Sequence, residues 1–265
     1  MNRTADIVIV GAGVIGSATA FELTKRGYKT LNIDKLPASG YGSTSNSCAI
    51  VRAHYSTWDG VAMAYEGFFY WDDWNKYLEV EDERGMAKYM KTGSIMFMLK
   101  GADHTKKSLK LFKQIGVEHE VWDLETLKKK MPIYSHDSFN GTSRPDEDDS
   151  FFDKSGDQIE GAVWTPGSGY VSDPQLATHN LQVATEAKGG EFLFDAEITE
   201  IRQSNGQIQG VTLKSGEQID CKVLVNVAGP HSFIINQMAG VEDDMKIKTK
   251  ALRHDNTCSF VTNTW

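Results

Sequence analysis

The chain has 265 residues, 28 of them basic and 36 acidic, and its formal net charge is −8. Its hydrophobic content of 40% is too high for a disordered chain, and its acidic balance argues against a nucleic-acid partner. No stretch reaches the roughly 18 consecutive apolar residues that a membrane-spanning helix needs, so we expect no membrane span. The length suits one large domain or two small ones.

The first residues and the cysteines predict a cytoplasmic protein with free thiols. The N-terminal segment lacks the small-residue cleavage site of a secretory signal. Cys48, Cys221 and Cys258 are odd in number and widely spaced, which fits neither a disulfide framework nor a zinc site. The acidic run at residues 144–149 lacks the ligand spacing and the turn glycine of a cation-binding loop, so we predict no metal site.

The first 34 residues have the pattern of a β-α-β unit. Residues 6–10 form a β-branched apolar run that predicts a buried parallel strand. A glycine-rich turn follows, then a predicted helix over residues 17–26 and a second predicted strand over residues 29–33. Asp34 stands at the end of that strand.

The glycines of this turn predict a dinucleotide-binding site. Gly11 permits a tight turn, Gly13 lets a pyrophosphate approach the backbone, and Gly16 lets helix and strand pack closely. The phosphates would then meet the unpaired N–H groups at the start of the helix. Asp34 follows Gly16 by eighteen residues, where a carboxylate can accept hydrogen bonds from an adenosine ribose.

The segment after Asp34 favours FAD over a nicotinamide cofactor. A simple nicotinamide-binding domain continues with further β-α units, whereas residues 39–48 form a loop of small and hydroxyl-bearing residues. Clustered hydroxyls and backbone amides suit an extended diphosphate and ribityl chain. A solvated linker of the same composition is the alternative interpretation.

A second group of strands is predicted near the C-terminus. Residues 190–202, 206–213 and 218–230 form alternating strands joined by Asn-Gly and Ser-Gly turns, a three-stranded meander. The last run becomes apolar and ends in Ala-Gly-Pro, which predicts a buried parallel strand whose small residues allow a ligand to approach.

Further elements are predicted between these two regions. The expected helices span residues 60–78, 104–115, 123–131 and 175–188, and the expected strands span residues 92–99 and 161–166. We predict an α/β fold: a Rossmann-type FAD-binding domain with a parallel sheet and a β-meander, plus an inserted α+β substrate domain. Its parts are assigned to residues 1–84 (FAD domain), 85–168 (substrate domain), 169–233 (FAD domain) and 234–265 (start of the substrate-domain return).

Five sequence motifs resemble the FAD-dependent amine and amino-acid oxidoreductases of the D-amino-acid oxidase superfamily, which includes glycine oxidase, sarcosine oxidase and dimethylglycine dehydrogenase. The motifs lie at residues 9–16, 42–45, 49–55, 167–175 and 225–230. The resemblance covers residue 7 to about residue 254, is specific to the superfamily, and does not select one substrate. It implies an FAD cofactor.

The resemblance also implies which residues meet FAD. Those expected at the diphosphate are Gly11, Gly13, Val14, Ile15 and Gly16; at the adenosine ribose, Asp34 and Lys35; in the second FAD loop, Ser43, Thr44 and Ser45; at the adenine, Ile198; and beside the cofactor at the end of a strand, Ala228 and Gly229.

The candidate substrate-binding residues lie in a short segment after the FAD loop. A carboxylate substrate needs a cation, most simply a bidentate arginine, and Arg52 is the candidate because a similar arginine in sarcosine-oxidase-like enzymes lies at the substrate end of the flavin. A structural ion pair is the alternative role for Arg52. His54 is a second catalytic candidate, with packing as its alternative. Ala49 replaces a second arginine of some relatives, which argues against sarcosine itself.

These patterns predict an FAD-dependent oxidoreductase that oxidises the C–N bond of a small amino acid or N-methylated amine to an imine. Its electrons would pass from flavin to oxygen, a quinone or an electron-transfer protein. Members of the superfamily are longer, so we expect a chain truncated at its C-terminus. A truncated, non-catalytic FAD-binding or interaction protein is therefore the main alternative, and an NAD-dependent dehydrogenase is a third.

Overall fold

The chain divides into two compact units. A computed structural model describes residues 3–101, 103–139, 149–150 and 152–243. The first unit comprises residues 1–46 and 178–265, and the second comprises residues 47–177. Residues 144–148 and 244–265, which hold most of the predicted acidic loop and of the predicted substrate-domain return, lie outside the described residues. The functional domain boundaries at residues 84, 168 and 233 stay a prediction.

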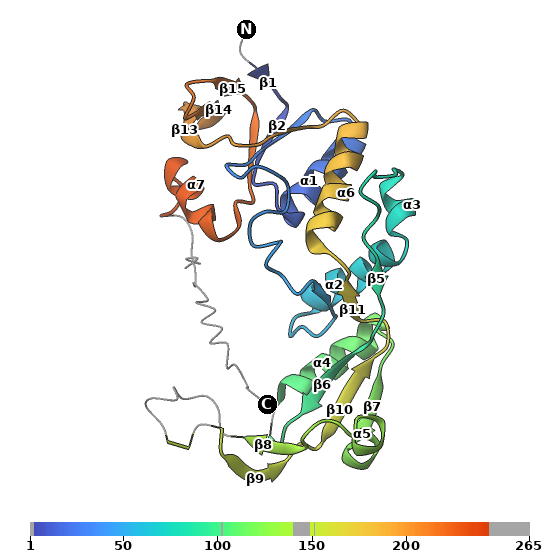
Figure 1. Ribbon diagram of the computed structural model, residues 1–265. Helices are drawn as coiled ribbons and strands as arrows, with labels where there is room; N and C mark the ends of the chain where they lie inside the picture. Colours follow the sequence, from blue (N-terminus) through green and yellow to red (C-terminus); the bar gives the residue numbers. More distant parts are fainter. Residues whose placement is uncertain (1–2, 102, 140–148, 151, 244–265) are drawn as a thin grey trace, which may run out of the picture. The chain divides into compact units, whose positions relative to one another are not determined.

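The first unit combines a parallel sheet with an antiparallel meander (Figure 1). Its elements are β1 (Arg3–Thr4), β2 (Ile7–Val10), α1 (Val14–Lys25), β3 (Thr30–Ile33), most of α6 (Pro174–Ala187), β12 (Glu191–Leu193), β13 (Ile198–Ser204), β14 (Gln207–Leu213), β15 (Gln218–Asp220), β16 (Val223–Asn226), a 3₁₀ turn (Gly229–His231) and α7 (Ser232–Met238).

The parallel sheet has the strand order β12-β3-β2-β16. Every residue of β2 and β3 is buried, which confirms the prediction of a buried parallel strand from the continuous apolar run at residues 6–10. Successive side chains of β2 belong to different hydrophobic clusters, because neighbours along a strand point to opposite faces of a sheet. Each fully buried aliphatic side chain contributes about 1.5–3 kcal/mol, so this short strand is a major stabilising element.

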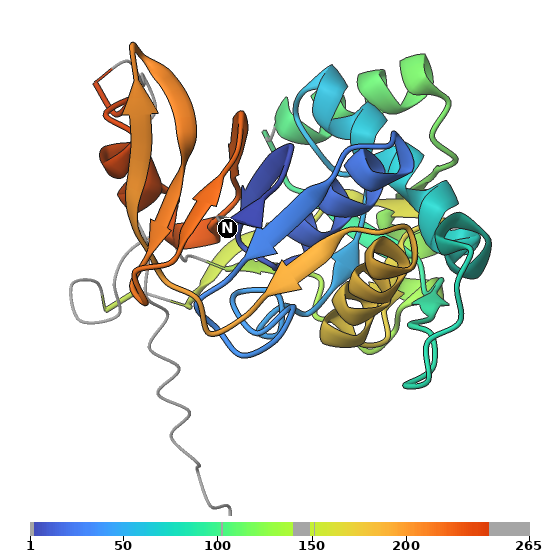
Figure 2. The same cartoon turned by 90° about the horizontal axis from the view of Figure 1, so that it is seen from above.

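The meander covers one face of that sheet. Its strands, which Figure 2 shows beside the parallel sheet, pair in the order β1-β15-β14-β13. Their inward side chains, such as Val211 and Ile219, pack with Val8 and Leu31. Asn205 and Gly206 both have positive φ, 50° and 73°, as expected for the two-residue turn between β13 and β14. The run expected at residues 190–202 differs from the prediction, since its first part, β12, pairs in parallel with β3 and not within the meander.

The second unit contains three small sheets and four helices among its described residues, besides the first residues of α6. Its elements are β4 (Ile50–Val51), α2 (Trp58–Asp72), α3 (Trp74–Leu78), β5 (Tyr89–Met90), β6 (Ser94–Met98), α4 (Asp103–Ile115), β7 (Glu120–Asp123), α5 (Leu124–Lys130), β8 (Asp137–Phe139), β9 (Lys154–Gln158), β10 (Gly161–Thr165) and β11 (Gly169–Val171).

The antiparallel sheet β6-β10-β7 is the centre of the second unit. Two adjacent residues of β10 belong to separate clusters, Val163 with Phe112 of α4 and Ala162 with Leu127 of α5, so the two helices cover opposite faces. The helix expected over residues 60–78 is divided at Asp73 into α2 and α3.

Within the described residues, no helix combines the length and the apolar character that crossing a bilayer requires.

Candidate functional site

The turn between β2 and α1 is closed so tightly that only glycine fits at two of its positions. Gly11 has φ +113°, and a Cβ there would lie 2.5 Å from the Val227 carbonyl oxygen. A Cβ on Gly16 would lie 2.0 Å from the Gly11 carbonyl oxygen. The start of α1 is therefore held against the end of β2 and beside the residues that follow β16, as the sequence predicted for a dinucleotide-binding turn.

The N-terminus of α1 presents backbone donors without an acidic side chain to occupy them. Gly13 is the N-cap residue, and the first turn contains no Asp or Glu. The N–H of Val14 donates to Thr44 Oγ1 at 3.1 Å. The N–H groups of Ile15 and Gly16 belong to the first turn, where a helix offers no internal acceptor, so they suit an anion such as a diphosphate.

Asp34 is fixed at the end of β3 by two backbone donors. Its Oδ2 accepts from the Ala12 N–H at 2.7 Å and its Oδ1 accepts from the Leu36 N–H at 2.9 Å. Each carboxylate oxygen keeps further lone-pair capacity, which a ribose hydroxyl can use. The Asp34 carbonyl also accepts from the Ala196 N–H at 3.0 Å, which brings the chain just before Ile198 to the same edge.

Lys35 and Ile198 occupy different environments beside Asp34. Lys35 is exposed, whereas the Ile198 side chain is 7% exposed and packs in the core between the meander and the sheet. Any contact of Ile198 with a cofactor would therefore come from its main chain.

The loop over residues 39–46 folds back onto the glycine turn. The Gly40 N–H donates to the Ala12 carbonyl at 2.8 Å, and the Ser45 N–H donates to the Gly40 carbonyl at 2.9 Å. Thr44 faces Val14, while Ser43 and Ser45 are exposed, with the Ser45 hydroxyl bonded to the Gly42 carbonyl. These hydrogen bonds hold the loop beside the glycine turn, so its predicted contact with FAD is compatible with its position.

The end of β16 completes the group. The Val227 N–H donates to the Val10 carbonyl at 3.0 Å, and the Ala228 Cα lies 3.2 Å from the position that a Cβ on Gly11 would occupy. Gly229 follows with φ +58°. The Asn226 side-chain amide donates to the Ser232 carbonyl at 2.8 Å, which fixes the turn after the strand.

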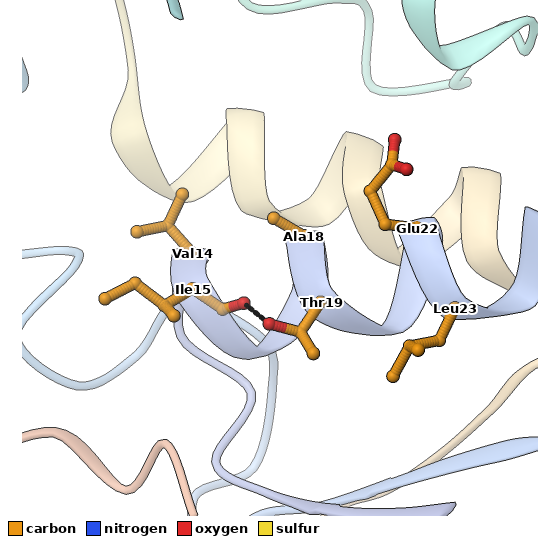
Figure 3. A pocket seen from close by; sticks show the side chains of 6 residues that line it. All are labelled: Val14, Ile15, Ala18, Thr19, Glu22 and Leu23. Carbon is orange, nitrogen blue, oxygen red and sulfur yellow. Dashed lines mark hydrogen bonds between the residues drawn. The ribbon is translucent and has the colours of Figure 1, made fainter. Parts of the chain in front are cut away.

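One face of α1 is an open, mostly apolar groove of about 540 Å³. Figure 3 shows its lining, which comes entirely from α1: Val14, Ile15, Ala18, Thr19, Glu22 and Leu23. The Ile15 side chain is 67% exposed in this groove, so the predicted role of Ile15 at a diphosphate falls to its backbone N–H.

In the second unit, Arg52 is an exposed cation whose polar contacts are with its own segment. Its Nη1 donates to the His54 carbonyl oxygen at 3.3 Å, and its guanidinium carbon lies 5.7 Å from the centre of the Tyr55 ring. Among the described residues, no carboxylate lies within ion-pair distance of Arg52. The alternative role, a structural ion pair, is therefore absent from this part of the chain.

His54 is half-buried and neutral at physiological pH. Its ring stacks on Phe112, with centroids 5.5 Å apart and an interplanar angle of 29°, and its Nε2 lies 2.9 Å from Thr165 Oγ1. Burial, and to a smaller extent the charge of Arg52, lower the pKa of His54 from 6.5 to about 4. The ring therefore satisfies both a packing contact and a hydrogen bond.

The structure adds residues that the sequence analysis did not select. Ala12 donates to Asp34 and accepts from Gly40, and Ser39 beside it has a buried hydroxyl without a partner among the described residues. Asn32 in β3 has a buried side-chain oxygen that accepts from none of the residues that the structure describes. A buried Asn in the strand of residues 29–33 was the one available sequence signal, whereas Ala12 makes its contacts through its main chain.

The first-unit residues fit an FAD diphosphate and ribose on these observations. The turn glycines bring the start of α1 against β2, and the first turn of α1 offers N–H groups that have no acceptor within the helix. Asp34 holds an oriented carboxylate, and Ser39 holds a buried hydroxyl that has no partner among the described residues. Within the described residues, no group of three or more His, Cys, Asp or Glu side chains is arranged to hold a metal ion.

The family model for FAD dependent oxidoreductases (DAO) matches residues 6–257. The chain belongs to this family. Members of the DAO family are FAD-dependent, which agrees with the site in the first unit.

Curated relatives include a putative sarcosine oxidase of Caenorhabditis elegans, 30% identical over 151 residues, an alignment that covers 55% of this chain and 36% of the relative. A monomeric sarcosine oxidase of Streptomyces avermitilis is 26% identical over 200 residues, covering 75% of this chain and 45% of the relative. The alignments thus span less than half of either relative.

A solved structure, the L-proline dehydrogenase of P. horikoshii, superposes with a TM-score of 0.73 at 22% identity, covering 91% of this chain and 57% of that one. This likeness confirms the predicted fold class, an α/β chain with a Rossmann-type parallel sheet.

Proposed function

We propose that this chain provides the FAD-binding and substrate-carboxylate-binding residues of an oxidoreductase that converts the C–N bond of a small amino acid or N-methylated amine to an imine. Arg52 binds the substrate carboxylate. The FAD residues are those of the glycine turn, Asp34, the 39–46 loop and the end of β16.

The observation that carries the substrate class is the state of Arg52. Its guanidinium is exposed, is oriented by a carbonyl oxygen, and has no carboxylate partner among the described residues. An oriented and unneutralised arginine is suited to a bidentate bond with a carboxylate ligand. The curated relatives named sarcosine oxidase support a substrate of this class.

The protein residues bind and orient, and the redox step belongs to the cofactor. Bound FAD supplies a two-electron acceptor for a hydride equivalent from the substrate carbon. Arg52 fixes the carboxylate end of the substrate, so that its amine-bearing carbon is presented in one orientation. The neutral imidazole of His54 adds no second positive charge beside Arg52.

The test begins with the visible spectrum of the purified chain. The proposal predicts bound flavin, and loss of flavin absorbance when N-methylated or D-amino acids are added without oxygen. Arg52→Lys keeps the charge without the bidentate fork, and Arg52→Gln removes the charge. We expect Arg52→Gln to raise the KM at least tenfold and Arg52→Lys to have a smaller effect. Wild-type kinetics for Arg52→Gln would reject the assignment.

A second candidate is a protein that binds FAD without turnover. The alignments span 36% and 45% of the two sarcosine-oxidase relatives, so turnover by this chain stays a proposal. Flavin that stays oxidised with every amino acid and amine tested would favour this candidate. The identity of the electron acceptor and the cytoplasmic location stay predictions.

A further inference from the structure

The segment that carries Arg52 is held from several sides within the second unit. Its strand β4 pairs with β11, and the Ala53 side chain is completely buried. The Ser108 hydroxyl of α4 donates to the Tyr55 carbonyl oxygen at 3.3 Å. These contacts fix the path of the segment, but none of them reaches the guanidinium of Arg52.

The remaining anchor is the imidazole of His54. Its Nε2 lies 2.9 Å from Thr165 Oγ1, and its ring lies against Phe112 of α4. Thr165 is fully buried at the end of β10, 111 residues away in sequence. The imidazole therefore connects the Arg52 segment to both the central sheet and the helix that covers it.

Thr165 is itself held in place by hydrogen bonds. Its Oγ1 lies 2.9 Å from Ser94 Oγ, accepts from Ser168 Oγ at 3.2 Å, and donates to the Ser94 carbonyl at 3.3 Å. A hydroxyl has one hydrogen to donate. The proton between His54 Nε2 and Thr165 Oγ1 lies on one atom or the other according to the imidazole tautomer, and in either case the bond ties the ring to the end of β10.

The main chain of His54 continues this chain of contacts to Arg52. The His54 carbonyl oxygen accepts from Arg52 Nη1 at 3.3 Å. We propose that His54 is a positioning residue: its imidazole, bonded to Thr165, holds the peptide whose carbonyl oxygen orients the Arg52 guanidinium toward a carboxylate ligand. The value of this orientation rests on the proposed function of Arg52.

The chemistry of the ring supports positioning over packing alone. A phenyl ring would keep the stack on Phe112 but would leave the buried Thr165 hydroxyl without its partner on the Arg52 segment. A protonated imidazole would place a second positive charge next to Arg52. The low pKa of His54, about 4, which burial and Arg52 produce, prevents this at neutral pH.

The test uses the full chain loaded with FAD and four variants. His54→Phe keeps the stack and removes the hydrogen bond, Thr165→Val removes the hydroxyl, and Thr165→Ser restores it. Thr105→Val is the matched control, because Thr105 is also buried in the second unit but its hydroxyl has no partner among the described residues.

Two measurements are made on each variant. We expect His54→Phe and Thr165→Val to raise the KM for a carboxylate-bearing substrate about tenfold while kcat changes less than threefold. In ¹⁵N NMR spectra, the Arg52 Nε–Hε signal, assigned by its loss in Arg52→Lys, should move toward the position of a freely rotating arginine. Thr165→Ser and Thr105→Val should match the wild type in both measurements.

The outcomes separate this inference from the proposed function. An unchanged Arg52 signal in both His54→Phe and Thr165→Val would overturn the positioning role, whatever the kinetics show. Failure of Thr165→Ser to restore the signal would also overturn it. If Arg52→Gln has wild-type KM while the Arg52 signal moves in His54→Phe, the positioning stands and the proposed role of Arg52 fails.

Discussion

Alanine at Gly13 should impair FAD binding while leaving the fold nearly intact, whereas alanine at Gly16 should impair both. Gly13 has φ −72°, which alanine adopts freely, and its Cβ would come no closer than 3.2 Å, to the Thr44 side-chain oxygen. The cost at this N-cap is about 0.5–1 kcal/mol. A Cβ on Gly16 would lie 2.0 Å from a backbone oxygen, so the turn must move, and overpacking of this kind costs about 1–3 kcal/mol or more.

The two variants distinguish a glycine needed for the approach of the cofactor, Gly13, from a glycine needed for the turn itself, Gly16. Circular dichroism of the FAD-free chains should show a melting temperature within about 3 °C of wild type for Gly13→Ala and a clearly larger fall for Gly16→Ala. Flavin fluorescence titration should show FAD affinity reduced at least tenfold in both, or about 1.4 kcal/mol. Wild-type FAD affinity in Gly13→Ala would refute the assignment of this glycine to close approach of the diphosphate.

Three further predictions concern single side chains. The pKa of His54 is lowered from 6.5 to about 4, so between these pH values the unfolded chain binds a proton that the folded chain does not. The free energy of unfolding should therefore fall by about 1–2 kcal/mol as the pH is lowered from 6.5 to 4, after allowance for solvent access. Urea titrations should show a smaller fall in His54→Phe. Tyr89→Phe removes a 2.6 Å hydrogen bond to the Gly167 carbonyl and should lower the free energy of unfolding by about 1 kcal/mol in the same assay. Burial, and then the charge of Asp72, raise the pKa of Tyr89 to about 12, so spectrophotometric titration of the wild type should show a tyrosine ionising near pH 12. Asp34→Asn leaves one acceptor for two backbone donors, so unfolding should become easier by about 1–2 kcal/mol and FAD binding weaker; unchanged urea midpoints would contradict this reasoning.

The β-α-β unit was predictable from sequence because its determinants are local. A continuous apolar run specified a strand buried on both faces, and the glycine spacing specified the turn and the start of α1. Asp123 likewise caps α5, the helix expected over residues 123–131, with its carboxylate accepting from the Thr126 N–H at 2.8 Å. In each case the residues that determine the structure lie close together in the sequence.

The errors arise where the sequence pattern is compatible with more than one structure. β12 was assigned to the meander because its alternation is the same in either sheet, and only its pairing with residues 31–33 shows that it extends the parallel sheet. The helix expected over residues 60–78 is broken at Asp73. The rings of Trp71 and Trp74 stack across the break, with their centroids 4.4 Å apart. Helical periodicity continues through this position and contains no sign of the interruption.

The same difference separates the two parts of the candidate site. The residues predicted to bind FAD offer mainly backbone N–H groups and positions without side chains, and glycine spacing indicates both of these directly in the sequence. Under the proposed function, substrate recognition depends on the direction of the Arg52 side chain, for which we propose a support made of a carbonyl oxygen, an imidazole and a hydroxyl from β10. Sequence reasoning could select Arg52 and His54 by chemistry, but the residue that links them to the sheet, Thr165, carries no motif. Specificity in this chain is therefore expected to change through substitutions at such supporting positions, while the cofactor turn tolerates almost none.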